Sequence, residues 1–479
     1  MVSDFFYPNM GGVEAHIYHL SQRLVRRGHK VIIVTHNYGQ RVGIRYLTSG
    51  VKVYHVPHWL VVDQVSLPTV YGFFPLFRYI VVRERIDVVH GHGAFSAMCH
   101  EAILHARTMG ISACFTDHSL FGFEDASSIL TNKLLKFTLS DIDHVICVSH
   151  TSKENTVLRA CLDPLNVSVI PNAVVAADFT PDVSKRRPGN VTVVVASRLV
   201  YRKGVDLLVS VVPLICSKFP DVDFLIAGDG PKRVDLERMR EKFGLQDRVR
   251  MLGAVSHAQV RSVLVQGHVF LNTSLTEAFC IAIVEAACCG LLVVTTKVGG
   301  VPEVLPDHMV RFAVPEVHSL STSLADAITT VRTHPPDPWR FHEEVKMMYD
   351  WTDVAERTEM VYKLIMVDPQ VSLMERFHRF YDCGAVAGIL SCMIIAVDYL
   401  FFLFLEWFVP RSSVDVAEAL DYDRFLTMCR MNVGRGRCSW VEVPAADGEE
   451  EDEGEGGLGR RATEDARRTD RDGREAEVG

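Results

Sequence analysis

The sequence of 479 residues predicts an α/β protein of two domains, each a parallel sheet with helices on both faces. Short runs rich in Val and Ile alternate with helical stretches. These runs are apolar almost throughout, which is typical of strands buried on both faces. The alternation pauses after residue 175 and restarts at residue 191, so we expect two domains. Ligands bind beyond the carboxyl ends of such strands, and two sheets that face each other form a binding cleft.

The first domain is predicted to span residues 1–175. We expect its strands at residues 30–35, 51–56, 86–90, 111–116, 144–148 and 167–170. A doubly wound domain opens with a buried strand, yet here the Gly-rich loop Pro8–Gly12 follows Met1 almost at once. We therefore expect that the chain begins inside strand one and that the first sheet lacks its central strand, which would lower its stability.

Gly11 and Gly12 open a predicted helix over residues 13–27. The first amides of a helix have no internal partner and carry the positive end of its dipole, so they favour an anion. A glycine pair is also typical of a simple turn, and that alternative stays open.

The second domain is predicted to span residues 191–367, after a linker over residues 175–190 that contains two Pro and three consecutive basic residues. We expect its strands at residues 191–196, 223–227, 248–252, 269–272 and 291–296. An amphipathic helix over residues 351–365 follows a Pro-rich turn and is expected to brace the cleft.

Residues 272–303 organise this second domain. Glu277 lies in the turn between a predicted strand and a predicted helix that starts at Ile281, where free amides would bind a phosphate. A carboxylate would repel that phosphate, so Glu277 is expected to point at sugar hydroxyls. Glu285 lies eight positions later, about one and a half turns into the helix, and is placed to accept hydrogen bonds from a ribose. Two solvated Glu residues on a helix are the alternative.

Two cations and one histidine follow predicted strands at their carboxyl ends. Arg198 and Lys203 come after residues 191–196 and are suited to neutralise a diphosphate. His118 comes after residues 111–116 and is suited to hold a sugar and its leaving phosphate, although a single His is more often structural. Asp141 and Asp143 precede a strand, away from the cleft, so we expect no metal ion and no cofactor in the reaction.

The formal net charge is −9, of which residues 447–479 contribute −7 through 13 acidic residues and six Arg. This low-complexity segment is expected to be disordered. The remaining chain is nearly neutral, which argues against a nucleic-acid partner. The twelve Cys are scattered through apolar runs and favour a reducing compartment.

Residues 383–405 form a run of 23 residues with a single charge, Asp398, and predict a C-terminal transmembrane helix. A buried core helix is the alternative. Basic residues at 376 and 379 weakly favour a cytosolic N-terminal side. Because an unpaired carboxylate in a bilayer is costly, Asp398 is expected to face a partner helix in a membrane complex.

These residues together resemble the retaining glycosyltransferases of the GT-B fold, family 4, and within them the catalytic subunits of phosphatidylinositol N-acetylglucosaminyltransferases. The resemblance covers about residues 1–410 and is carried by residues 3–14, 116–123, 272–285 and 299–303. It implies two Rossmann-like domains, an acceptor-side domain first and a nucleotide-sugar-binding domain second.

The resemblance also implies an activity: transfer of GlcNAc from UDP-GlcNAc to phosphatidylinositol with retention, the first step of GPI-anchor biosynthesis. It implies a single-pass protein of the endoplasmic reticulum membrane with cytosolic catalytic domains, and other membrane subunits of a GlcNAc-transferase complex as partners. By position, the catalytic residues are Glu277 and His118, and the donor-binding residues are Gly11, Gly12, Arg198, Lys203, Phe279, Cys280, Ile281 and Glu285.

The sequence departs from the wider family at Cys280, where Gly is usual and where a side chain would crowd the anion-binding turn. Two other functions remain open. One is a different lipid-directed transferase of the same fold, such as one that uses GDP-mannose. The other is an inactive scaffold in a membrane complex.

Overall fold

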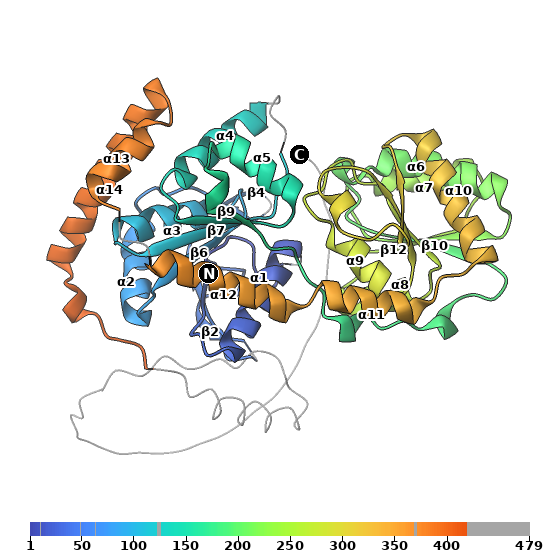
Figure 1. Cartoon of the computed structure of the whole chain (residues 1–479), viewed down its shortest axis with the longest axis horizontal. Coiled ribbons are helices and arrows are strands. Elements are labelled where there is room, and N and C mark those ends of the chain that lie inside the picture. Colours follow the sequence, from blue (N-terminus) through green and yellow to red (C-terminus); the bar gives the residue numbers. More distant parts are fainter. Residues whose placement is uncertain (10, 48, 63, 122–125, 368–370, 419–479) are drawn as a thin grey trace, which may run out of the picture. The chain divides into compact units, whose positions relative to one another are not determined.

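The computed structural model describes residues 1–9, 11–47, 49–62, 64–121, 126–367 and 371–418 (Figure 1). Residues 447–479, for which the sequence predicts disorder, lie outside this part of the chain. The first sheet contains the strands β1 (Ile32–His36), β2 (Gly43–Tyr46), β3 (Lys52–Val56), β6 (Val88–His92), β7 (Ser112–Asp117), β8 (His144–Cys147) and β9 (Val167–Val169).

Residues Met1–Ser3 occupy the centre of this sheet, between the groups β2-β3-β1 and β6-β7-β8-β9. Val2 pairs in parallel with Val34 on one side and with Gly91 on the other. The Val2 N–H donates to the carbonyl of His90 (2.9 Å), and its own carbonyl accepts from the His92 N–H (3.1 Å). The central position that the sequence led us to expect empty is therefore filled by a short segment that bonds both neighbours.

Helices cover both faces of the first sheet: α1 (Gly12–Arg26), α2 (Phe74–Glu84), α3 (Ala97–Thr108), α4 (Ala126–Leu139) and α5 (His150–Ala160). A small antiparallel hairpin, β4 (Leu60–Val62) and β5 (Val65–Ser66), precedes α2. β2 is also antiparallel to its neighbour β3. The sequence did not predict β2, which is partly exposed and has no continuous apolar run, or the hairpin, whose strands are only three and two residues long.

The second sheet is entirely parallel, in the order β12-β11-β10-β13-β14-β15. Its strands are β10 (Val191–Ala196), β11 (Val222–Ala227), β12 (Val249–Gly253), β13 (Val269–Asn272), β14 (Leu292–Thr296) and β15 (Val310–Ala313). Its helices are α6 (Val205–Lys218), α7 (Arg233–Lys242), α8 (His257–Leu264), α9 (Ile281–Cys288), α10 (Val317–Thr333) and α11 (Pro338–Met348). Successive strands are added towards one edge of the sheet from β10 to β12 and towards the other edge from β13 to β15. The switch point lies between β10 and β13, and an open α/β sheet binds ligands at such a point.

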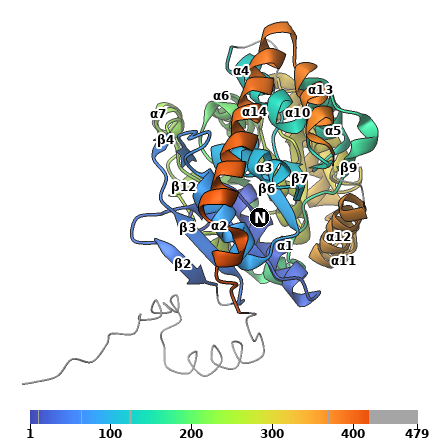
Figure 2. The same ribbon diagram turned by 90° about the vertical axis from the view of Figure 1, so that its left-hand side faces the viewer.

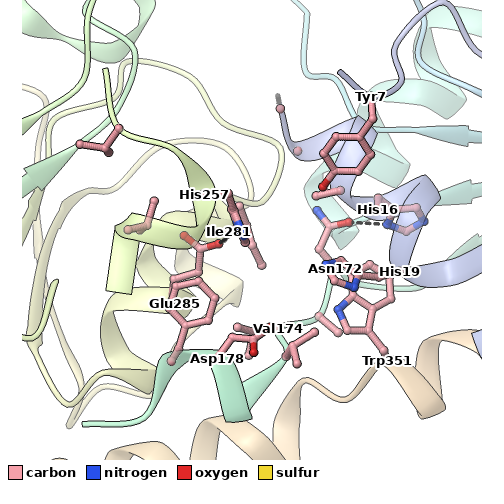
Figure 3. Close-up of a pocket in the computed structure, with 18 residues that line it drawn as sticks. Tyr7, His16, His19, Asn172, Val174, Asp178, His257, Ile281, Glu285 and Trp351 are labelled. Carbon is pink, nitrogen blue, oxygen red and sulfur yellow. Dashed lines mark hydrogen bonds and ion pairs between the residues drawn. The ribbon is translucent and has the colours of Figure 1, made fainter. Parts of the chain in front are cut away.

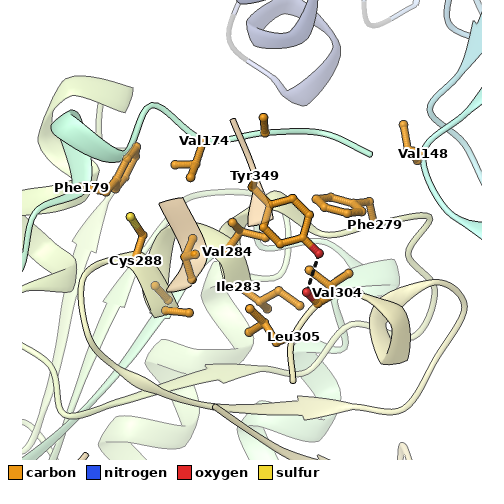
Figure 4. Close-up of a cluster of buried hydrophobic side chains, with 14 of the residues drawn as sticks. Val148, Val174, Phe179, Phe279, Ile283, Val284, Cys288, Val304, Leu305 and Tyr349 are labelled. Atoms are coloured by element: carbon orange, nitrogen blue, oxygen red, sulfur yellow. Dashed lines mark hydrogen bonds between the residues drawn. The ribbon is translucent and has the colours of Figure 1, made fainter. Parts of the chain in front are cut away.

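A large apolar cluster supports the turn before α9 (Figure 4). Phe279 and Ile283 pack there with Tyr349, whose ring meets Phe279 edge-on at 5.6 Å. The Tyr349 hydroxyl donates to the carbonyl of Val304 at 2.5 Å. Since these side chains are buried, the turn rests on a rigid base.

Helix α12 (Trp351–Val367) returns from the second domain and packs on the first. Arg27, the residue that follows α1, contacts Glu356 at 2.9 Å and Glu359 at 2.6 Å. The Tyr362 hydroxyl lies 2.7 Å from Nδ1 of His90. The helix predicted over residues 351–365 is confirmed, and it packs against residues of both domains.

Helices α13 (Leu373–Tyr381) and α14 (Ala385–Phe408) follow, and α14 runs alongside α2 and α3 of the first domain (Figure 2). Among the described residues, α14 is the single helix long and apolar enough to cross a membrane. Asp398 was predicted to face a partner helix rather than lipid, and in the structure it is buried against a helix of the same chain, α3. Its carboxylate accepts from Thr108 at 2.5 Å and lies 2.8 Å from Nδ1 of His105, both on α3. The first domain itself therefore supplies the partners that this buried carboxylate needs.

Candidate functional site

A cavity of about 250 Å³ lies between the two domains (Figure 3). The first domain lines it with the loop and helix at Gly11, Gly12 and His16, and the second with Ile281 and Glu285 of α9. The connecting segments complete it with Asn172, Asp178 and Trp351. Four of the ten predicted site residues therefore meet in one cavity: Gly11, Gly12, Ile281 and Glu285.

Glu277 and Lys203 meet at the switch point of the second sheet. Glu277 follows β13, Lys203 follows the neighbouring β10 in a 3₁₀ turn (Tyr201–Lys203), and their side chains form an ion pair. The Ser274 hydroxyl also donates to Glu277, at 2.8 Å. Burial lowers the pKa of Lys203, but the Glu277 carboxylate outweighs it and the net shift is upward, so the ammonium stays charged.

Glycines allow the segments around this ion pair to approach closely. Gly204 has a φ of 65°, and a Cβ there would collide with the carbonyl of Thr273. The Gly300 N–H donates to the Glu277 carbonyl at 3.0 Å, and a Cβ on Gly299 would collide with that carbonyl. These contacts fix the direction of the Glu277 turn.

The Arg198 side chain is exposed and makes no hydrogen bond or ion pair with any residue that the structure describes, although the Arg198 carbonyl accepts from the Val200 N–H at 3.0 Å. Its charge nevertheless acts on both walls of the cleft. It lowers the pKa of Glu14 on α1, against a larger rise caused by burial, and it opposes the charge of Lys203. The guanidinium therefore has no described side-chain partner, and its charge reaches Lys203.

The amino end of α9 is open to an anion. Its N-cap, Cys280, has φ 69° and ψ 74°, and no side chain caps the first amides. Burial, with a further contribution from Glu277, raises the pKa of the Cys280 thiol to about 12, so the thiol is neutral. The Phe279 side chain lies in the core, so only the Phe279 backbone could contact a bound ligand.

Glu285 faces the cavity, but it is not free. Its Oε1 lies 3.2 Å from Nε2 of His257, at the start of α8. The hydrogen bond to Glu285 raises the pKa of His257. A ribose hydroxyl at Glu285 would therefore share the carboxylate with an imidazole.

His118 belongs to a buried group of imidazoles in the first domain. Nδ1 of His92 lies 3.4 Å from Nε2 of His118, and the His16 and His118 rings meet edge-on at 4.7 Å. Burial, reinforced by the neighbouring His16, lowers the pKa of His118 and keeps it neutral. In the part of the chain that the structure describes, His16, His92 and His118 are the group whose spacing would admit a metal ion, with ligand atoms within 4.8 Å of one another.

Two further contacts join the domains beside the site. The Glu303 carboxylate accepts from the backbone N–H groups of His150 (2.6 Å) and Thr151 (2.8 Å) at the start of α5. Arg202 donates to the carbonyl of Leu120 at 3.2 Å. All three hydrogen bonds cross from the second domain to the first and hold the two walls of the cleft together.

Sequence reasoning missed His16, Asn172, His257 and Trp351 as cavity residues. Asn172 and His257 follow β9 and β12 within a few residues. Because ligands bind beyond the carboxyl ends of such strands, a search of the residues after every strand would have found them. His16 and Trp351 lie on helices. Their rings are 5.3 Å apart because α12 packs against α1, and no local pattern predicts that contact.

Comparisons with known families agree with this geometry. Residues 36–125 match the family described as PIGA (GPI anchor biosynthesis), and residues 177–347 match glycosyl transferases group 1. Among solved structures, sucrose-phosphate synthase from Thermosynechococcus elongatus covers 74% of this chain and 94% of its own, with 19% identity and a TM-score of 0.62. Anabaena HepE, solved with UDP and glucose, covers 75% and 98%, with 17% identity and a TM-score of 0.59. These likenesses establish the predicted GT-B fold.

Curated relatives are far more similar in sequence. The chain is 60% identical to the phosphatidylinositol N-acetylglucosaminyltransferase gpi3 subunit of Schizosaccharomyces pombe, over 87% of this chain and 91% of the relative. It is 57% identical to a phosphatidylinositol N-acetylglucosaminyltransferase subunit of Homo sapiens, over 87% and 86%. The GPI3 subunit of Saccharomyces cerevisiae is 48% identical, over 87% and 95%. The chain therefore belongs to the GPI3 family of phosphatidylinositol N-acetylglucosaminyltransferase subunits, which are glycosyltransferases.

Proposed function

We propose that this glycosyltransferase transfers GlcNAc from UDP-GlcNAc to phosphatidylinositol with retention, the first step of GPI-anchor biosynthesis. The observation that carries the proposal is the charge arrangement at the switch point. Lys203 is held by Glu277, and Arg198 nearby has no described partner. These cations and the open end of α9 suit a nucleotide diphosphate.

The donor would lie across the cleft. Its diphosphate would meet Arg198, Lys203 and the backbone of Phe279, Cys280 and Ile281, while Gly11 and Gly12 approach from the opposite wall. Glu277 would hold the sugar and Glu285 the ribose. His118, kept neutral by burial, would donate a hydrogen bond near the sugar-phosphate linkage without adding charge.

The acceptor hydroxyl would attack from the same face of the sugar as the leaving diphosphate, which would accept its proton. The amides and the two cations stabilise the charge that develops on the leaving group, and this is the reason we propose a reaction without a metal ion. Added chelator should then leave the transfer rate unchanged.

We further propose that the protein works in the endoplasmic reticulum membrane, with cytosolic catalytic domains and other membrane subunits as partners. The apolar helix α14 and the word "subunit" in the names of the relatives support this placement.

The test compares nucleotide sugars on membranes that contain the full chain. Labelled UDP-GlcNAc should give labelled GlcNAc-phosphatidylinositol, whereas label from GDP-mannose in the lipid would point to another transferase. Glu277→Gln should abolish rescue of cells that lack surface GPI-anchored proteins, with Glu154→Gln on the exposed face of α5 as the matched control. Full rescue by Glu277→Gln would instead indicate a scaffold.

A further inference from the structure

A second group of polar side chains lies at the carboxyl ends of the first domain's strands, and none of them lines the cavity of Figure 3. Asp4, His36 and Ser66 are fully buried, at 0% exposure each. Both carboxylate oxygens of Asp4, Nε2 of His36 and Oγ of Ser66 have no hydrogen-bond partner in the described part of the chain. The two ring nitrogens of His58 share this property. Buried polar atoms without partners are costly, so such a concentration points to a ligand.

These residues converge from four segments. Asp4 follows the central segment Met1–Ser3, His36 ends β1, Ser66 ends β5, and His58 lies between β3 and β4. The backbone of Asp4 is already bonded, because its N–H donates to the Ser96 hydroxyl at 2.8 Å and its carbonyl accepts from Tyr38. The carboxylate is the part of Asp4 that remains available.

The chemistry of the group suits a polyol. Burial raises the pKa of Asp4 to about 6, and polar contacts of the carboxylate with Ser66, with the Ser96 hydroxyl and with the Ala97 backbone oppose that rise, so the carboxylate is ionised and accepts bonds at neutral pH. These contacts are too long or too bent to count as hydrogen bonds, so both carboxylate oxygens still lack a partner. Burial, with His58 nearby, lowers the pKa of His36, so its imidazole is neutral. Neutral imidazoles and hydroxyls both donate and accept, and a carboxylate accepts from hydroxyls.

The hairpin that carries Ser66 is apolar on its outer side. Trp59, Leu60, Val61 and Leu67 are 83%, 45%, 60% and 47% exposed. A few residues after the hairpin, the Tyr71 hydroxyl donates to the carbonyl of Ile394 in α14 at 3.1 Å. A polar group beneath an apolar hairpin, beside the helix that is apolar enough to enter a membrane, matches a ligand with a polar head and a lipid tail.

We propose that Asp4, His36 and Ser66 bind the hydroxyls of the cyclic polyol headgroup of the acceptor lipid. This inference rests on the proposed function and adds the residues that recognise the acceptor. The apolar outer side of the hairpin contacts the bilayer from which that lipid comes.

The test uses the full chain in its membrane complex, as wild type, Asp4→Asn, Ser66→Ala and the control His144→Gln, whose ring bonds Ser168 elsewhere in the domain. The probes are soluble inositol 1-phosphate and phosphatidylinositol vesicles, read as protection against heat. Both should protect the wild type and the control, with about tenfold weaker affinity in Asp4→Asn. The KM for phosphatidylinositol should rise about tenfold while the KM for UDP-GlcNAc stays constant.

Equal affinity of wild type, Asp4→Asn and Ser66→Ala for both probes overturns the inference, and so does a wild type that neither probe protects. Protection of every variant by vesicles alone means that the hairpin recognises the bilayer and not the headgroup, which also overturns it. Protection of the wild type that Asp4→Asn weakens, without any GlcNAc transfer, supports this inference and refutes the proposed function.

Discussion

The two walls of the cleft use opposite chemistry. The second domain presents charged groups, with Lys203 paired to Glu277, Glu285 bonded to His257 and Arg198 without a described partner. The first domain presents buried imidazoles, and burial lowers the pKa of His16 to about 4. The charged wall therefore suits a diphosphate, whereas the neutral imidazoles of the other wall can donate to and accept from hydroxyl groups without adding charge.

This difference also explains why the residues of the charged wall can be predicted from the sequence and those of the neutral wall cannot. A charged side chain next to a predicted buried strand must be paired or solvated, so it stands out against apolar neighbours. His16 and His92 lie on a helix and at a strand end that are far apart in the chain, and either alone is compatible with a simple structural role.

The largest effect should come from removing Arg198 from the charged wall. Arg198→Ala should lower kcat about 10²-fold to 10³-fold, because one donor to the leaving diphosphate is lost. The thermal midpoint should not change, since Arg198 has no described partner to lose. Transfer kinetics and a melting curve on the same preparation check this, with Arg238→Ala on α7 as the exposed control. A rate within threefold of the wild type would contradict the assignment.

The buried imidazoles of the neutral wall should make the free energy of unfolding depend on pH. His16 binds a proton at about pH 4 in the folded state and near 6.5 when unfolded, so stability is full above 6.5 and falls as the pH drops towards 4. His16→Gln should lack this loss, and the difference between the two unfolding free energies should approach roughly 3 kcal/mol at pH 4.

Melting curves between pH 4 and pH 7.5 measure this difference. His308→Gln, on the second domain, controls for the removal of an imidazole outside the cluster. Parallel curves for the wild type and His16→Gln would show that the imidazoles of this wall are solvated and charged.

A smaller effect is expected at the contact that joins the walls. Glu303→Ala removes the carboxylate bonded to the first amides of α5, so the closed cleft loses about 1–2 kcal/mol. We expect kcat/KM for the donor to fall about tenfold while the melting midpoint moves little. Glu154→Ala on α5 is the control. Loss of stability without a change in kcat/KM would mean that the contact is purely structural.

The smallest effect should come from Cys280, which has a left-handed φ of 69°. Cys280→Gly removes the strain of a side chain in this region and should stabilise the fold by about 0.5–1 kcal/mol. Thermal unfolding measures it. Cys161→Gly, at the C-cap of α5 with a φ of 55°, is the matched control, because it gains the same backbone freedom away from the turn before α9. Lower stability of Cys280→Gly would show that its thiol packing outweighs the strain.

The sheets could be predicted to the residue where the strands are continuous apolar runs. β10 and β13 begin and end where the sequence predicted. β2, the β4–β5 hairpin and β15 were not predicted, since short strands at sheet edges or on the surface carry little apolar periodicity. The order of the strands, and with it the switch point between β10 and β13, also required the structure.

For the site, the sequence placed Arg198, Lys203 and Glu277 in loops after the carboxyl ends of strands and Glu285 inside the following helix, and the structure has them after β10, after β13 and in α9. The sequence also predicted the apolar helix, but it did not predict that Asp398 finds His105 and Thr108 within the same chain. A single polar residue in an apolar run requires a partner, and the run itself does not identify that partner.

The sequence by itself determined the two parallel sheets, the loops at their carboxyl ends and the charges placed there, because burial and strand periodicity act locally along the chain. The tertiary structure alone decided which loops meet. It brings His16 to His118, joins Glu303 to α5 and gathers Asp4, His36 and Ser66 under one hairpin. Such contacts depend on how helices pack and on which strands are neighbours, and no single segment of the chain encodes either.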